Sequence, residues 1–162
     1  MSQQCVHMAG LAPVAAPLDV CEACVREGTE WFHLRQCLVC GHTLCCDNSP
    51  RQHMSGHFRE VGHPVMRAAS PGEDWAWCFA DNAMIRETPA GWAAYDPFIV
   101  NGVGVAAEHL ASGGSVHPAE DFVTEDGLPI GDWFAYVREL HETDDLDPID
   151  VAAIEAIPGW AW

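Results

Sequence analysis

The chain has no lysine. Its 162 residues include seven basic residues, all of them arginine, against 24 aspartates and glutamates, which gives a formal net charge of −17 at pH 7. Residues 1–85 contain five arginines and nine acidic residues, whereas residues 86–162 contain two arginines and fifteen acidic residues. Because nucleic-acid affinity rests mainly on lysine and arginine side chains that neutralise phosphates, this composition argues against nucleic acid as a partner.

The sequence also lacks a long apolar run. No stretch approaches the roughly 20 apolar residues that a membrane-spanning helix needs, so we expect no membrane partner. The first ten residues, MSQQCVHMAG, lack the basic region and the long apolar core of a secretory signal, which favours a cytoplasmic, reducing location. In a reducing compartment, spaced cysteines more often hold a metal than form disulfides.

What the chain does contain is a dense run of cysteines and histidines. All eight cysteines precede residue 79, so the second half of the chain cannot depend on disulfides or thiolate sites. Two pairs of cysteines have the two-residue gap by which one turn presents two thiolates to a tetrahedral zinc ion, and three histidines follow them. These residues are Cys21/Cys24, Cys37/Cys40, His53, His57 and His63.

The histidines leave two zinc-binding arrangements open. A helix is predicted to start with Ser49 as N-cap and Pro50 at its first position, with Gln52 completing a capping box, and to end near residue 60. His53 and His57 are four residues apart on this helix and therefore share a face. Either both bind one zinc ion, or each joins a different one. The second, interleaved arrangement has the sets Cys21, Cys24, Cys45 and His53, and Cys37, Cys40, His57 and His63.

A third metal site is predicted from residues outside this run. A strand is expected at residues 75–80, with its aromatic side chains on one face and Cys78 on the other. Cys78 can then face the Cys-x-His pair formed by Cys5 and His7. Asp81 can complete the set, because a carboxylate is an accepted zinc ligand. The sequence therefore predicts three Zn²⁺ ions.

These motifs resemble the ubiquitin-protease-type (UBP) zinc finger over about residues 5–81. The pattern of that family is matched at Cys5/His7, Cys21/Cys24, Cys37/Cys40, Cys45, His53/His57, His63-Pro64 and Trp77-Cys78. The resemblance implies the interleaved arrangement, a small sheet with one helix, and the three ligand sets above. The chain departs from the family at Asp81, where a cysteine is usual, and at Cys46, where glycine is usual.

The same resemblance bears on ligand binding. Members of the family bind the free C-terminus of ubiquitin, and an arginine two positions after the equivalent of Cys45 contacts the terminal carboxylate. Here that position is Asp47, which reverses the sign of the charge-assisted contact. The resemblance therefore implies a retained fold with weak or absent binding to ubiquitin tails. Candidate ligand-contacting residues are Trp77 and Phe79, whose usual role is core packing, and Arg35, Arg51 and Arg59, whose usual role is solvated surface.

The second half of the chain differs in character. A linker is expected at residues 86–96, followed by helices at 104–112, at 131–142 and from Pro148, which together would form a small bundle. Residues 92–162 resemble the bacterial helicase-associated domain, through the segments DGLPIGDW (126–133), Val137-Arg138 and IPGWAW (157–162). The resemblance implies nucleic-acid association, with Trp133, Trp160 and Trp162 able to stack on bases. The basic surface of that family is missing.

Catalysis is not expected. Most cysteines are assigned to closed zinc sites, and Cys46 is left as a free thiol or an alternative ligand to Cys45. The predicted protein is α+β, with a zinc-bound sheet-and-helix finger at 1–85, a linker at 86–96 and a three-helix domain at 97–162. Its predicted function is a non-catalytic interaction module for protein or peptide. The alternative is a nucleic-acid-associated accessory protein.

Overall fold

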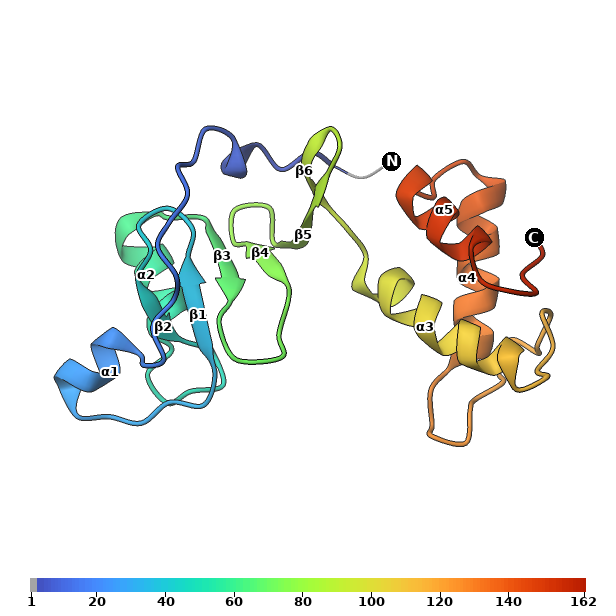
Figure 1. Cartoon of the computed structure of the whole chain (residues 1–162), viewed down its shortest axis with the longest axis horizontal. Helices are drawn as coiled ribbons and strands as arrows, with labels where there is room; N and C mark the ends of the chain where they lie inside the picture. Colours follow the sequence, from blue (N-terminus) through green and yellow to red (C-terminus); the bar gives the residue numbers. More distant parts are fainter. Residues whose placement is uncertain (1–2) are drawn as a thin grey trace. The chain divides into compact units, whose positions relative to one another are not determined.

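The computed structural model describes residues 3–162 and divides into two compact units (Figure 1). The N-terminal unit comprises Gln3–Tyr95 and the C-terminal unit Asp96–Trp162. No helix of the described residues is long and apolar enough to cross a membrane. The expected α+β class is confirmed, because strands occupy the first unit and helices dominate the second.

The N-terminal unit is built on an antiparallel sheet with six strands among the described residues, in the order β2-β1-β3-β4-β5-β6. The helix α2 packs against β1 and β2, and the short helix α1 lies beside β2 (Figure 1). A single-turn helix, η1, precedes them on the N-terminal arm. The elements are η1 (Val6–Met8), α1 (Glu22–Glu27), β1 (Leu34–Cys37), β2 (Thr43–Cys45), α2 (His53–Val61), β3 (Val65–Ala68), β4 (Ala76–Cys78), β5 (Ala83–Thr88) and β6 (Gly91–Ala94).

The strand β4 shows the alternation that the sequence predicts. The aromatic residues Trp75, Trp77 and Phe79 pack against the apolar cluster beneath α2. Cys78 belongs to a different cluster, on the other face of the sheet, together with Cys5. The period of two along the strand thus brings Cys78 to the N-terminal arm.

The prediction for the start of α2 was wrong. The helix begins at His53, and Gln52 before it has a left-handed φ of 49° and makes no side-chain cap. Ser49 is buried, and its hydroxyl accepts a hydrogen bond from the Phe32 N–H at 3.0 Å. Because this hydroxyl ties the loop after β2 to the loop before β1, it is not available as an N-cap.

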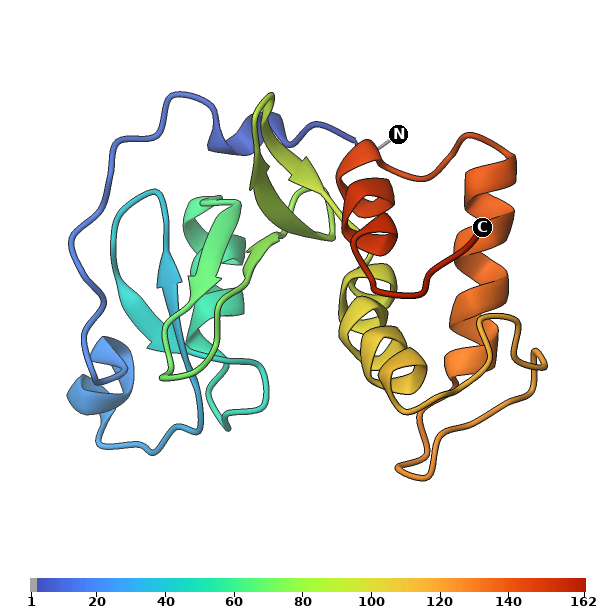
Figure 2. The same cartoon turned by 45° about the vertical axis from the view of Figure 1, so that its right-hand side comes forward.

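Residues 86–96, expected to be a linker, instead contain the end of β5 and all of β6. The two strands form a hairpin that pairs Thr88 with Gly91, whose φ of 113° is allowed to glycine. On the N-terminal arm, Cys5 donates its N–H to the Trp92 carbonyl at 2.8 Å, so the arm runs beside β6 (Figure 2). The Pro-Ala-Gly turn suggested a linker, but it is the tip of a hairpin.

The C-terminal unit contains three helices, α3 (Pro97–Ala111), α4 (Ile130–Glu142) and α5 (Pro148–Glu155). The first begins earlier than predicted, because Asp96 caps it by accepting the Phe98 N–H at 2.9 Å. The side chain of Trp133 is buried against α3 and donates its indole N–H to the Ile99 carbonyl at 3.1 Å. A Cβ at Gly102 would lie 2.0 Å from that indole nitrogen, so glycine permits the close approach of α3 and α4.

Candidate metal centres

The structure gathers cysteine and histidine side chains, with one aspartate, into three groups of four. Within each group, the potential ligand atoms all lie within 4.8 Å of one another. Group 1 is Cys21, Cys24, Cys45 and His53; group 2 is Cys37, Cys40, His57 and His63; group 3 is Cys5, His7, Cys78 and Asp81. These are the sets of the interleaved arrangement and the predicted third site.

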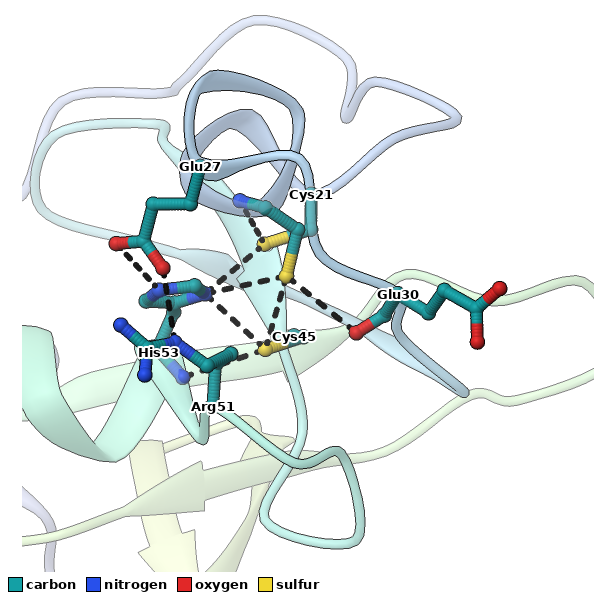
Figure 3. Close-up of polar contacts among 7 residues, drawn as sticks. Cys21, Glu27, Glu30, Cys45, Arg51 and His53 are labelled. Atoms are coloured by element: carbon teal, nitrogen blue, oxygen red, sulfur yellow. Dashed lines mark hydrogen bonds and ion pairs between the residues drawn. The ribbon is translucent and has the colours of Figure 1, made fainter.

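Group 1 joins the ends of three elements (Figure 3). Cys21 caps α1, with its Sγ accepting the Cys24 N–H at 3.4 Å, while Cys45 ends β2 and His53 begins α2. The Nδ1 atom of His53 lies 3.5, 3.3 and 3.4 Å from the sulfurs of Cys21, Cys24 and Cys45. One imidazole nitrogen facing three fully buried sulfurs is the donor set of a structural Cys₃His zinc site.

A second layer of contacts orients the His53 ring. Its Nε2 lies 3.2 Å from one carboxylate oxygen of Glu27, and the other oxygen accepts a hydrogen bond from Arg51 Nε at 2.8 Å (Figure 3). The hydrogen bond from Arg51 keeps the pKa of Glu27 below its ordinary value. An ionised Glu27 favours the tautomer protonated at Nε2, which leaves the Nδ1 lone pair toward the sulfurs, as in many zinc-bound histidines.

Group 2 forms around the turn between β1 and β2. Cys40 Sγ lies 3.3 Å from His57 Nε2, and Cys37 Sγ lies 3.6 Å from His63 Nδ1. The two imidazole nitrogens are 3.1 Å apart. Gly41 has a φ of 82° and donates its N–H to the Cys37 carbonyl, which folds the turn back. Two ring nitrogens and two sulfurs at these distances fit one tetrahedral zinc ion.

Group 3 links the N-terminal arm to the end of β4. His7 Nδ1 lies 3.5 Å from Cys78 Sγ, 4.0 Å from Cys5 Sγ and 3.1 Å from an oxygen of Asp81. The Asp81 N–H donates to Cys78 Sγ at 3.4 Å, so the turn after β4 presents both a sulfur and a carboxylate. The set is of mixed sulfur, nitrogen and oxygen donors, all of which zinc accepts.

Burial affects the thiols in a way that fits a bound cation. Without a metal, burial raises the pKa of the Cys5 thiol to about 12, and it also raises the pKa values of Cys21, Cys37, Cys45 and Cys78. Contacts between buried neutral thiols would add little to the stability of the fold. A zinc ion supplies the charge that turns them into thiolates and makes the clusters favourable.

Cys46 lies outside all three groups. Its side chain is buried, and its sulfur lies 3.4 Å from the Ser49 hydroxyl. The alternative ligand to Cys45 that the sequence left open is therefore not brought to group 1. Successive residues of an extended strand end point in opposite directions, which separates the two sulfurs.

A pocket of about 160 Å³ lies beside group 1, since Cys46 and Met54, which line it, directly follow two members of that group. Arg35 is buried at the pocket, where its guanidinium stands 4.5 Å above the Trp75 ring and donates to Glu73 at 2.7 Å. Asp47 is also in the lining and accepts a hydrogen bond from the Ser55 hydroxyl.

The structure does not bring the predicted ligand-contacting residues together at one site. Arg35 and Phe79 line the pocket, while Trp77 packs against the core and is not in the lining. Trp75 also lines the pocket, although the sequence did not identify it as a ligand-contacting residue. Arg51 is engaged with Glu27, and Arg59 lies in a separate groove near α1.

The tryptophans of the C-terminal unit serve its interior. Trp133 is buried, Trp160 packs against it with ring centroids 5.8 Å apart, and Trp162 stacks on His141 at 3.8 Å. Arg138 donates to main-chain carbonyls at 2.7 and 2.9 Å and lies over the Trp160 ring. The aromatic motif is therefore held by contacts within the C-terminal unit.

One comparison with known protein families agrees with the donor sets. Residues 21–90 match the model of a family described as a Zn-finger in ubiquitin-hydrolases and other proteins. The chain is also similar to protein RPA1320 from Rhodopseudomonas palustris, a solution NMR structure, with 42% sequence identity over 52% of this chain and 82% of that one and a TM-score of 0.45. No curated protein matches the chain.

Proposed function

We propose that the N-terminal unit, in which residues 21–90 match the model of a Zn-finger family found in ubiquitin-hydrolases and other proteins, is a non-catalytic module that binds protein or peptide. Domains of this family are generally protein-interaction modules. The role of zinc in this proposal is structural, because groups 1 to 3 tie together loops that the small sheet alone would not fix.

The observation that carries the proposal is the pocket beside group 1. Its volume of about 160 Å³ suits one side chain or one peptide end, since pockets for whole small molecules are usually about 300–1,000 Å³. Trp75, Phe79 and Met54 supply apolar lining, and Arg35, which is paired with Glu73, adds a guanidinium group. An apolar pocket with a few placed polar groups is the usual form of a peptide-anchoring site.

Asp47 determines which peptides would fit. Its carboxylate is exposed in the pocket lining, so a terminal carboxylate entering the pocket would meet a like charge. At 4 Å this repulsion is about 1 kcal/mol in water and larger near a protein surface. We therefore infer that the tail of ubiquitin binds weakly, and that peptides with a neutral or cationic group at this point bind better.

The donor sets favour a non-catalytic role. Each of the three groups supplies four donors, whereas a catalytic zinc site keeps a position open for water or substrate. The Cys46 thiol contacts a serine hydroxyl, which cannot act as the base that a thiol nucleophile requires. A cytoplasmic location follows from the same proposal, since reducing conditions keep the thiols available to zinc.

The test is binding of the zinc-loaded full chain to ubiquitin and to a library of peptides with free and with amidated C-termini. We expect selected peptides to lose about tenfold or more in affinity when Phe79→Ala removes the pocket wall. Asp47→Arg should raise the affinity for ubiquitin by about tenfold, because it restores a charge-assisted contact. The matched control is Asp19→Arg, an exposed charge reversal on the N-terminal arm. If no peptide is selected and Asp47→Arg gains nothing, the proposal fails.

A further inference from the structure

A groove of about 640 Å³ between α1, α2 and β2 concentrates positive charge in a chain that has very little of it. Three of the seven arginines line this groove, namely Arg26, Arg51 and Arg59. The acidic residues in the lining are Glu27 and Glu60. The groove is thus locally cationic although the chain carries a net charge of −17.

Two of these arginines are free to meet a ligand. Arg26 and Arg59 are exposed, and among the described residues neither has an ion pair or a side-chain hydrogen bond partner. Arg51 differs, because its guanidinium holds Glu27 against the histidine of group 1. The carboxylate of Glu22 acts on Arg26 only through a weak electrostatic interaction, so both guanidinium groups remain exposed for contact with a ligand.

The other arginines are engaged elsewhere. Arg35 pairs with Glu73, Arg67 donates to the Gln36 side chain at 2.9 and 2.6 Å, Arg86 lies over the Tyr95 ring, and Arg138 donates to main-chain carbonyls. The cations available to an external ligand in the N-terminal unit therefore include the pair in this groove.

We propose that this groove binds an acidic segment of a partner protein. The lining also includes Val61, whose side chain is 52% exposed, whereas the apolar lining residues Ala23 and Leu44 are buried. A segment that places an apolar residue between carboxylates matches this combination of two arginines and one exposed apolar side chain. A nucleic acid is a poorer fit, because its affinity depends on neutralising many phosphates and this groove offers only two exposed arginines without an ion pair.

This site is separate from the pocket beside group 1, so it adds a second contact to the proposed interaction module. Arg26 and Arg59 lie in the last turns of α1 and α2, where a cation also interacts favourably with the helix dipole. If Arg26 and Arg59 only stabilise the ends of their helices, replacing them should affect folding alone. A binding role predicts an effect on affinity with folding unchanged.

The probe is a fluorescein-labelled ten-residue peptide in which glutamates alternate with glycine and leucine, with both ends blocked. Blocked ends remove any terminal carboxylate, so the result does not depend on the pocket beside group 1. Fluorescence anisotropy with the zinc-loaded full chain, at 25 and 150 mM salt, should show binding that weakens at the higher salt. The double variant Arg26→Gln/Arg59→Gln should bind about fivefold more weakly, which is the loss expected for two exposed ion pairs.

The control changes the same net charge at other places. Ala90→Glu/Ala153→Glu adds two negative charges at exposed positions outside the groove and should change the affinity less than twofold. Zinc content and Tm are measured for every variant, and the single variant Arg59→Gln serves if the double variant is unstable. An equal loss in the control pair, or no binding at 25 mM salt, overturns the proposal. Tighter binding of a ten-residue oligothymidylate, lost in the same variant, would replace the acidic peptide with nucleic acid.

Discussion

Eight cysteines lie in the N-terminal unit and none in the C-terminal unit, and the two interiors differ accordingly. In the first, several of the most completely buried side chains are thiols that belong to groups 1 to 3. In the second they are Trp133, Phe134, Val137 and Ile154. A thiol buries far less apolar area than a tryptophan or phenylalanine. Metal coordination therefore takes the place in one unit that aromatic packing has in the other.

The largest expected effect is that of removing zinc. Structural zinc sites contribute apparent binding free energies of about 10–16 kcal/mol at pH 7, so chelation should unfold the N-terminal unit. The C-terminal unit should remain folded, because its core contains no metal ligand. The measurement is the set of tryptophan indole signals in a two-dimensional NMR spectrum. Those of Trp31, Trp75, Trp77 and Trp92 should collapse, and those of Trp133, Trp160 and Trp162 should persist.

Added zinc should restore the lost signals, which separates metal loss from irreversible damage. If all seven indole signals collapse together, the two units depend on one another and the comparison fails. If none collapses, groups 1 to 3 do not hold the N-terminal unit.

The reverse experiment removes the aromatic core. Trp133→Ala should destabilise the C-terminal unit by about 3–5 kcal/mol, because it deletes a buried ring and leaves the Ile99 carbonyl without its donor. Zinc stoichiometry, measured by native mass spectrometry, should not change. The control is Phe32→Ala, since that ring is 69% exposed and its loss should cost less than about 1 kcal/mol. A loss of zinc in Trp133→Ala would contradict the independence of the two interiors.

The sequence predicted the members of the metal groups better than the elements that hold them. Regular spacing identified the cysteine pairs, and the alternation along β4 placed Cys78 opposite its aromatic neighbours. Spacing could not choose between one zinc and two for His53 and His57. The two histidines share a helix face, but His53 lies nearest to the sulfur of Cys24 and His57 to that of Cys40. This difference depends on the tertiary structure and cannot be read from the spacing.

Other features depended on contacts that local sequence does not show. Ser49 looked like a helix cap, but the fold uses its hydroxyl to bind the Phe32 N–H. Residues 86–96 were predicted to be a linker, but most of them pair in the hairpin of β5 and β6, and this pairing is a contact between strands. The pairing of Glu27 with Arg51 joins residues 24 positions apart and gave no local signal.

The Glu27–Arg51 pair lies beside group 1, so a substitution there tests one metal group of the N-terminal unit against the other two. Glu27→Gln removes the carboxylate beside His53 Nε2, and the loss of such a second-layer partner typically lowers metal affinity by about 10–100-fold. The effect should be confined to one of the three metals, because Glu27 contacts only the histidine of group 1 among the described metal-group residues. Stepwise competition with a chelator, followed by native mass spectrometry, would show one zinc ion leaving earlier.

Glu30→Gln is the matched control for this last prediction. Glu30 lies near the same group, and its main-chain carbonyl is 3.7 Å from Cys24 Sγ, but its side chain points away from the cluster (Figure 3). Glu30→Gln removes the same negative charge but leaves the His53 imidazole and its contact with Glu27 intact. If the effect of Glu27 depends on this hydrogen bond, Glu30→Gln should change the zinc affinity by less than about twofold. Equal losses of zinc affinity in both variants would mean that Glu27 acts through its negative charge and not through its hydrogen bond to His53. The ordering of His53 would then rest on the packing of α2 against the sheet, as the order of the C-terminal unit rests on packing.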